Sequence, residues 1–287
     1  MINNTASLHP SPLSGKTILL LGGTGSFGQE FVRVALAEHN PQSIRIFSRG
    51  EYLQSQMAYR FQDTRLRFFI GDIRDKERLY RAADGVNIII LAAALKQVPT
   101  CEYNPLEAIK TNVEGAANVI DAALNQQVQK VIGLSSDKAV AALNLYGATK
   151  AVMEKLLVQA NVYTGMGGTR FACTRYGNVA FSRGSVLPLF LKQKERGLPL
   201  TITHTDMTRF WLTIDQAVKF VLASLNKMQG GEIFIPKLPS FGIMTLAAAI
   251  SPDVRQRLYV GIRPGEKLNE VLVVPEESRH SRDCGNS

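Results

Sequence analysis

The stretch Thr17-Ile-Leu-Leu-Leu-Gly-Gly-Thr-Gly-Ser-Phe-Gly28 decides the fold. Its first five residues are almost wholly apolar and predict a short buried strand. Four glycines follow, and they satisfy both the Gly-x-Gly-x-x-Gly and the Gly-x-x-Gly-x-x-Gly spacing: Gly22, Gly23, Gly25 and Gly28. Such a turn lets the backbone approach a pyrophosphate and aims a helix N-terminus at its negative charge. Because a helix-like segment, residues 26–39, comes next, the sequence predicts a dinucleotide site rather than an ordinary turn.

The second strand indicates which dinucleotide binds. Residues 44–47 form this strand, and Ser48 and Arg49 follow it, where an NAD site usually has an acid for the ribose 2′-hydroxyl. An Arg attracts a 2′-phosphate and a Ser can donate a hydrogen bond to it, so the sequence favours NADP. The alternative is that Arg49 only solvates the end of the strand.

Strands and helices alternate along the first two thirds of the chain. Expected strands are 17–21, 44–47, 66–70, 87–91, 131–134 and 171–175, and expected helices are 26–39, 75–83, 105–124 and 145–163. This alternation predicts an α/β fold with a doubly wound parallel Rossmann sheet, whose ligands lie at the carboxyl ends of the strands.

Residues at those strand ends are expected to complete the cofactor site. Asp72 and Ile73 are placed to contact the adenine, and three small alanines after the fourth strand let a cofactor lie close to the backbone. The expected cofactor residues are Gly22, Thr24, Gly25, Ser26, Phe27, Gly28, Ser48, Arg49, Asp72, Ile73, Ala92, Ala93, Ala94, Tyr146 and Lys150.

Beyond residue 180 the alternation becomes irregular, which predicts a smaller C-terminal substrate-binding lobe. The NADP-binding Rossmann domain is expected at 14–180, and residues 206–236 return to it through a helix at 213–228 and a strand at 232–235. The lobe then comprises residues 181–205 and 237–287, and residues 1–13 form a loose N-terminal tail.

Candidate catalytic residues follow the fifth strand. Ser136, Asp137 and Lys138 come directly after it, and Tyr146 and Lys150 stand four apart at a helix start, so the last two share one face. A Tyr beside an ammonium ionises more easily, which suits a base that takes a hydroxyl proton while a hydride leaves the carbon. The alternatives are a half-buried Tyr capped by a solvated Lys, and a surface ion pair between the acid and its neighbouring Lys.

Composition excludes several classes of protein. The chain has 287 residues, 45% of them hydrophobic, which is ample for a large core. Its net charge of +9 is scattered, with no nucleic-acid-binding motif, and polyanionic nucleotides account for it equally well. The longest apolar run, residues 86–95, is too short for a membrane span, and the three widely spaced cysteines predict neither a metal site nor a disulfide framework. The N-terminus has no secretory signal, so a cytoplasmic location is expected.

Seven motifs in order carry a family resemblance. They are Gly22-Gly-Thr-Gly-Ser-Phe-Gly28, Phe69-Ile-Gly-Asp72, Ala92-Ala-Ala-Leu-Lys96, Asn144-Leu-Tyr-Gly-Ala-Thr-Lys150, Arg175-Tyr-Gly-Asn178, Thr208-Arg-Phe-Trp211 and Ile262-Arg-Pro-Gly-Glu-Lys267. The chain resembles the extended short-chain dehydrogenase/reductases. More closely, it is similar to the soluble UDP-N-acetylglucosamine 4,6-dehydratases that invert C5 and begin pseudaminic acid synthesis.

The resemblance implies a role for each candidate. Tyr146 takes the C4 hydroxyl proton as hydride passes to NADP⁺, Lys138 removes the C5 proton, and Asp137 protonates the departing C6 hydroxyl. Ser136 and Lys150 complete the catalytic set. A basic Lys requires its ammonium to be disfavoured by burial and nearby positive charge, and a proton-donating Asp requires the opposite shift. Because position 146 is a Tyr, where relatives that retain C5 typically have Met, the inverting type is expected.

The substrate implied by the resemblance is UDP-N-acetylglucosamine, and homo-oligomers are expected. The residues that match substrate-holding positions are Lys96, Asn178, Arg209, Arg263 and Glu266. Two alternatives remain open: a UDP-sugar 4-epimerase of the same fold, which needs no acid/base pair for elimination, and a non-catalytic NADP-binding protein.

Overall fold

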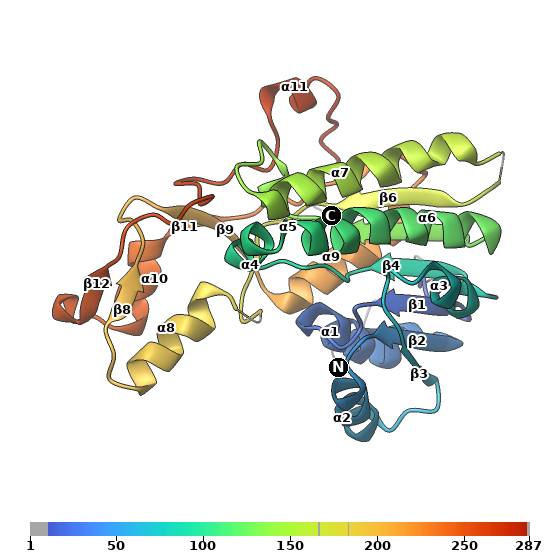
Figure 1. Cartoon of the computed structure of the whole chain (residues 1–287), viewed down its shortest axis with the longest axis horizontal. Coiled ribbons are helices and arrows are strands. Elements are labelled where there is room, and N and C mark those ends of the chain that lie inside the picture. Colours follow the sequence, from blue (N-terminus) through green and yellow to red (C-terminus); the bar gives the residue numbers. More distant parts are fainter. Residues whose placement is uncertain (1–10, 166, 183, 286–287) are drawn as a thin grey trace, which may run out of the picture.

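The computed structural model describes residues 11–165, 167–182 and 184–285. Its central sheet has seven strands in the order β10-β6-β5-β4-β1-β2-β3 (Figure 1), and every pairing in it is parallel. The order reverses between β1 and β4, so the expected doubly wound Rossmann sheet is confirmed. The strands are β1 (Thr17–Leu21), β2 (Ser43–Ser48), β3 (Leu66–Ile70), β4 (Ile88–Leu91), β5 (Lys130–Leu134), β6 (Arg170–Thr174) and β10 (Ile233–Phe234).

Helices cover both faces of this sheet. The helices along the chain are α1 (Ser26–Val34), α2 (Glu51–Phe61), α3 (Lys76–Ala83), α4 (Val98–Tyr103), α5 (Pro105–Ile109), α6 (Gly115–Asn125), α7 (Leu145–Gln159), α8 (Val186–Glu195), α9 (Ile214–Lys227), α10 (Ile243–Ile250) and α11 (Pro275–Ser278), of which α8 and α10 pack in the smaller lobe instead. No element was predicted where α2 and α8 lie. The first of these has mixed polarity with only two buried residues, so its periodicity is weak.

Alternation along β1 divides the core into two layers. Ile18 and Leu20 pack with residues of α1 and α9 on one face of the sheet. Leu19 and Leu21 pack with residues of α3, α6 and α7 on the other. Because side chains alternate along a strand and both faces are covered, every residue of β1 has to be largely apolar.

Two expected helices contain a wider, π-helical turn. One is Ala35–His39 after α1, and the other is Lys110–Glu114 between α5 and α6. Asn112 lies in the second turn, where its side chain accepts from the backbone N–H of Leu95 and donates to the carbonyl of Leu95, both at 2.8 Å. The irregular turn therefore holds the segment that follows β4.

The small lobe lies beside the sheet, at the left in Figure 1. It contains a parallel pair, β8 (Leu200–Ile202) with β12 (Arg257–Tyr259), packed against α8 and α10 around its own apolar cluster. A three-stranded sheet joins β7 (Asn178–Val179), β9 (Thr208–Leu212) and β11 (Ser240–Gly242). Of residues 206–236, α9 and β10 pack on the central sheet, whereas β9 belongs to this smaller one.

The N-terminal segment is described from Ser11 onward. Leu13 is fully buried in the core beneath β1 and α1, and the hydroxyl of Ser11 lies 2.8 Å from His39 Nδ1. The expected loose tail of residues 1–13 otherwise lies outside the described residues.

Candidate active site

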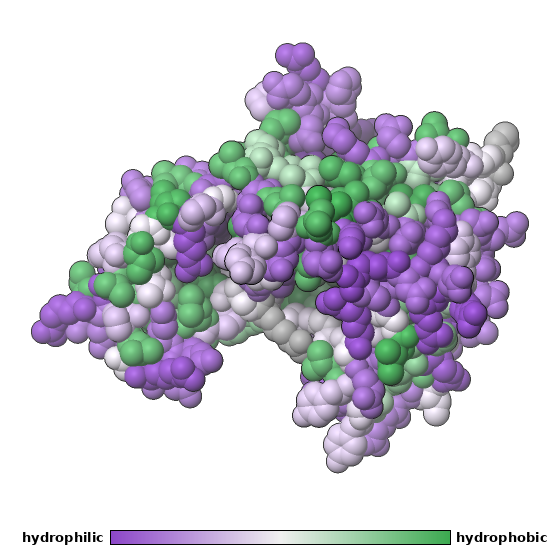
Figure 2. Space-filling view, in the orientation of Figure 1, coloured by the Kyte–Doolittle hydropathy of each residue, from purple (hydrophilic) through white to green (hydrophobic). Residues whose placement is uncertain are grey.

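A cavity of about 740 Å³ lies between the carboxyl ends of the strands and the small lobe. Figure 2 shows the molecular surface hollowed between the lobe at the left and the part of the body that contains α2. Two expected site residues do not line it, Asp72 and Ile73. Those that do are Gly22, Thr24, Gly25, Ser26, Phe27, Gly28, Ser48, Arg49, Ala92, Ala93, Ala94, Lys96, Ser136, Asp137, Lys138, Tyr146, Lys150, Asn178, Arg209, Arg263 and Glu266.

The glycine turn is packed too closely for side chains. A Cβ on Gly28 would lie 2.2 Å from the carbonyl oxygen of Gly23. A Cβ on Gly22, whose φ is +81°, would lie 2.8 Å from the backbone of Ala93. Both obstacles are backbone atoms, which cannot move aside, so both positions require glycine. The N-terminus of α1 is thereby brought to the cavity wall with its first N–H groups available to an anion.

Arg49 stands at the rim of the same wall. Its side chain is 60% exposed, and its guanidinium lies 3.8 Å from the carboxylate of Asp72. Asp72 is held more closely by Arg74, at 2.6 Å. Ile73 is buried in the core against α6. An exposed guanidinium with so distant a partner can turn toward an anionic ligand at little cost.

The residues after β5 and the start of α7 form one cluster, in which Asp137 and Tyr146 are buried and Ser136 and Lys138 are half-buried. Ser136 donates to Asp137 Oδ1 at 2.8 Å, and Lys138 Nζ lies 3.1 Å from the same oxygen. Asp137 is fully buried, and its Oδ2 has no hydrogen-bond partner among the described residues. Burial raises the pKa of Tyr146 to about 12, although the charge of Lys138 and a hydrogen bond with Ser136 act in the opposite direction.

Tyr146 has a different cationic neighbour from the expected one. The cation that favours its phenolate is Lys138 rather than Lys150. Lys150 is buried, and its Nζ lies 3.2 Å from Met153 Sδ, one turn along α7. Burial lowers the pKa of Lys150 to about 8, and the nearby Cys173 and Glu154 oppose this shift only in part. A shared helix face was therefore not sufficient to pair the two side chains.

Lys138 is charged, which corrects the expectation of a disfavoured ammonium. Burial acts against the charge, but the carboxylates of Asp137 and Glu270 outweigh it, and the pKa of Lys138 is raised. Glu270 Oε1 lies 3.3 Å from Lys138 Nζ, and the Glu270 side chain is 3% exposed. The sequence did not reveal Glu270 as a site residue. The available signal was its place three residues beyond the Ile262–Lys267 motif.

The segment of residues 263–270, here called the C-terminal loop, is fastened over this cluster. Asn144 Nδ2 donates to the carbonyl of Gly265 at 2.7 Å, and Lys267 Nζ donates to the carbonyl of Val140 at 2.5 Å. Asn144 and Val140 both lie in the stretch that leads from Lys138 to α7, whereas Gly265 and Lys267 belong to the loop. The loop therefore covers the side of the cavity that Asp137, Lys138 and Tyr146 line.

Arg209 holds the C-terminal loop from the other side. It is 8% exposed, and its guanidinium donates to the carbonyls of Lys267 and Leu268, both at 3.0 Å. Arg263 and Glu266, by contrast, are partly exposed and lie 3.8 Å apart at the mouth of the cavity. Of the expected substrate residues, Arg209 therefore uses most of its N–H donors in hydrogen bonds within the protein.

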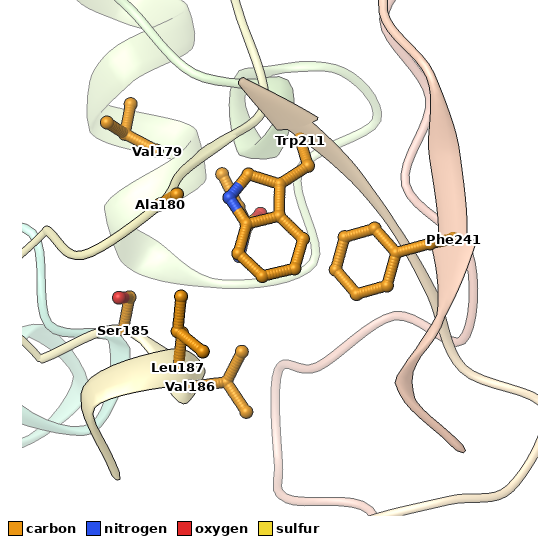
Figure 3. Close-up of a pocket in the computed structure, with 8 residues that line it drawn as sticks. Val179, Ala180, Ser185, Val186, Leu187, Trp211 and Phe241 are labelled. Carbon is orange, nitrogen blue, oxygen red and sulfur yellow. The ribbon is translucent and has the colours of Figure 1, made fainter. Parts of the chain in front are cut away.

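A second, much smaller cavity of about 10 Å³ lies between the strands β7, β9 and β11 and the start of α8 (Figure 3). Trp211 and Phe241 form one wall with ring centroids 4.3 Å apart. The side chains of Asn178, Ser185 and Trp211 each have a buried polar atom without a hydrogen-bond partner among the described residues, and all three line this cavity. It is about the size that one water molecule requires.

Arg175, the first residue after β6, joins three parts of the chain. It makes paired hydrogen bonds to Glu154 of α7 and to Glu277 of α11, and it donates to the carbonyl of Leu272 at 2.9 Å. Its side chain is 3% exposed. Burial opposes its charge, but the two carboxylates raise the pKa of Arg175 above its usual value. The C-terminal segment is therefore attached to the core of the nucleotide-binding half.

The sheet, the glycine turn and the Tyr-Lys helix define a Rossmann protein of the extended short-chain dehydrogenase/reductase type. The chain belongs to the polysaccharide biosynthesis protein family, whose sequence pattern matches residues 18–287. It is 51% identical over 274 residues to a UDP-N-acetylglucosamine 4,6-dehydratase (inverting) of Campylobacter jejuni, covering 95% of this chain and 82% of that protein. The expected resemblance is thus confirmed.

Other relatives include a UDP-glucose 4-epimerase of Rickettsia felis, 44% identical over 94% of this chain and 81% of that protein. Among solved structures, Pen from Bacillus thuringiensis superposes with a TM-score of 0.89 at 38% identity, covering 93% of this chain and 86% of that one. DesIV, a dTDP-glucose 4,6-dehydratase from Streptomyces venezuelae, superposes with a TM-score of 0.81 at 23% identity over 92% of this chain and 90% of that one, a likeness of fold alone.

The described residues contain neither a candidate membrane span nor a candidate metal site. None of their helices is both long and apolar enough to cross a membrane. Within the same residues, no three His, Cys, Asp or Glu side chains are grouped so that they could hold a metal ion.

Proposed function

We propose that this protein catalyses the 4,6-dehydration of UDP-N-acetylglucosamine with NADP as cofactor and with inversion at C5, the opening step of a pseudaminic acid-type pathway. The observation that carries the proposal is the Asp137–Lys138 pair beside Tyr146, in which Asp137 is buried and Lys138 is half-buried. A hydroxyl oxidation alone needs the Tyr, whereas elimination of water needs a further acid and a further base. The identity of 51% to an inverting dehydratase supports the same reaction.

The part of the cavity that the glycine turn, Ala93, Ser48 and Arg49 line, here called the nucleotide wall, has the features that a dinucleotide requires. Gly22 and Gly28 bring the backbone and the N-terminus of α1 to the cavity wall, and the Ala93 backbone packs directly against Gly22 in the same wall. Arg49 and Ser48 favour a cofactor with a 2′-phosphate. When bound, the nicotinamide supplies the hydride acceptor and donor that the reaction requires.

Three side chains divide the proton transfers. Tyr146 takes the proton of the C4 hydroxyl, and the resulting 4-ketone acidifies the hydrogen at C5. Lys138 removes that C5 proton, and Asp137 gives a proton to the C6 hydroxyl as it leaves as water. Ser136 donates to Asp137 and also contacts Tyr146, so it keeps these two groups in one hydrogen-bonded unit.

The proposal places a condition on Lys138. Its raised pKa means that it is protonated at neutral pH in this state of the site. A base must first lose that proton and an acid must first gain one, so a proton has to pass from Lys138 to Asp137, whose Oδ1 lies 3.1 Å from Nζ, before the elimination step.

Variants of the cluster test the proposal. Tyr146→Phe should lower turnover of UDP-N-acetylglucosamine about 10²- to 10⁴-fold, the usual contribution of an acid/base group, with NADP binding retained. Tyr103→Phe, at an 87% exposed position, is the matched control and should leave the rate unchanged. Normal dehydration by the Tyr146 variant would remove the phenol from the mechanism.

A second candidate, 4-epimerisation of a UDP-sugar, is favoured by the 44% identity to an epimerase. The product separates the two, because dehydration gives a 4-keto-6-deoxy sugar whereas epimerisation gives UDP-N-acetylgalactosamine. Asp137→Asn should stop the first reaction but would leave the second largely intact.

A further inference from the structure

The acid/base cluster contains a carboxylate that comes from the C-terminal loop. Glu270 Oε1 lies 3.3 Å from Lys138 Nζ. Asp137 Oδ1 lies 3.1 Å from the same nitrogen but comes from the turn that follows β5. Glu270 lines the main cavity and its side chain is 3% exposed. A buried carboxylate is costly unless it is paired, so this contact is a built feature of the site.

Glu270 is itself balanced by a second cation. Lys267 Nζ lies 3.6 Å from Glu270 Oε2, and Lys267 also donates to the carbonyl of Val140, two residues after Lys138. Glu270 Oε2 has no hydrogen-bond partner among the described residues. The charges therefore run in a row, Asp137, Lys138, Glu270 and Lys267, from the sheet to the C-terminal loop.

We propose that Glu270 is a positioning residue that aims Lys138 toward Asp137 and sets the pH at which Lys138 can act as a base. This inference rests on the proposed function, because it concerns the base assigned there. Its consequence is that the C-terminal loop, and not only the sheet, controls when the C5 proton can be removed.

All the groups that face Lys138 enter this inference. Asp137 lies on its own turn, Tyr146 approaches from α7, and Glu270 approaches from the C-terminal loop. The two carboxylates favour the ammonium, and both have to be considered because removal of one leaves the other in place. Replacing Glu270 by Gln removes one negative charge and should make Lys138 lose its proton at lower pH.

The experiment titrates Lys138 directly. The 287-residue chain is labelled with ¹³C at the lysine ε-carbon, NADP is added, and the Lys138 signal is assigned by its loss in Lys138→Met. Glu270→Gln should lower the titration midpoint of Lys138 by about one pH unit, and Glu270→Asp should restore part of the shift. The acidic limb of the dehydration rate against pH should move in the same direction by a similar amount.

Two further variants keep the test decisive. Glu276→Gln removes the same charge from an exposed position on α11 and should leave the Lys138 midpoint unchanged. Lys267→Met removes the cation that balances Glu270, so it should raise the Lys138 midpoint, and it serves if Glu270→Gln does not fold. An unchanged midpoint in Glu270→Gln, or in Lys267→Met when the first variant does not fold, overturns the inference.

Different results would refute the role of Glu270 and the proposed dehydration. The titration needs no substrate, so an absent 4-keto product would refute the dehydratase assignment whatever the Lys138 midpoint is. Conversely, normal dehydration with an unchanged midpoint and an unchanged pH profile in Glu270→Gln would refute the role of Glu270 alone.

Discussion

The two walls of the main cavity are held together by different kinds of contact. The nucleotide wall is backbone held in close contact, with no room for a methyl group on Gly28 or Gly22. The opposite wall, here called the catalytic wall, contains Asp137, Lys138, Tyr146 and Glu270. It is held by side-chain contacts between residues far apart in sequence, such as the hydrogen bond from Asn144 to Gly265 and the ion pair of Lys138 with Glu270. Close backbone packing fixes a shape, whereas ion pairs and side-chain hydrogen bonds can be adjusted by charge and pH. We infer that the first wall determines what binds and that the second determines when protons move.

The largest effect is expected where a side chain enters the nucleotide wall. Gly28→Ala places a methyl group against the carbonyl of Gly23, so it should abolish NADP binding, measured by calorimetry. Gly165→Ala is the matched control, since a Cβ there meets nothing within 4 Å, and it should bind normally. Unchanged affinity in the Gly28 variant would show that this turn does not form the cofactor wall.

The attachment of the C-terminal segment should have the next largest effect. Arg175→Met leaves Glu154 buried without its partner, which typically costs about 3–5 kcal/mol of unfolding free energy. Urea unfolding should report this loss, and limited proteolysis should cut first near α11. Arg255→Met, which breaks an ion pair at a 91% exposed side chain, should leave the midpoint unchanged. Equal stability in the two variants would mean that the Arg175 cluster does not anchor the segment.

A smaller effect is expected at the rim of the nucleotide wall. Arg49→Ala should weaken NADP binding about tenfold or more, because it removes a charge-assisted contact to the 2′-phosphate, and NAD should bind as before. NAD is the internal control in this comparison. A wild-type protein that binds NAD more tightly than NADP would contradict the assignment of Ser48 and Arg49.

The difference between the walls also explains what could be predicted from sequence. The strands, the glycine turn and the position of Asp137 after β5 were predictable, because each depends on neighbouring residues and on the rule that parallel strands end at one edge. The pairing of Arg175 with Glu277 was not, since these residues are 102 positions apart and either could be an ordinary surface charge. Glu270 escaped prediction for the same reason.

Local rules also failed at particular places. Tyr146 and Lys150 share a helix face, yet the buried Lys150 amine lies against Met153 Sδ. The cation that acts on the Tyr146 phenol is Lys138 instead. The π-helical turn at Lys110–Glu114 interrupts a helix whose apolar pattern gave no sign of it. Both features depend on tertiary packing, because one requires a buried amine and the other requires Asn112 to reach the loop after β4.

The most direct test of the account is the product formed from UDP-N-acetylglucosamine in heavy water with NADP present. Proton NMR should show a C6 methyl group and no C5 proton signal, carbon NMR should show a C4 ketone and a deuterated C5 with L-arabino geometry, and Lys138→Met should give none of this product. UDP-N-acetylgalactosamine as the product, with no loss of water, would contradict the assignment of Asp137 and Lys138 as an elimination pair.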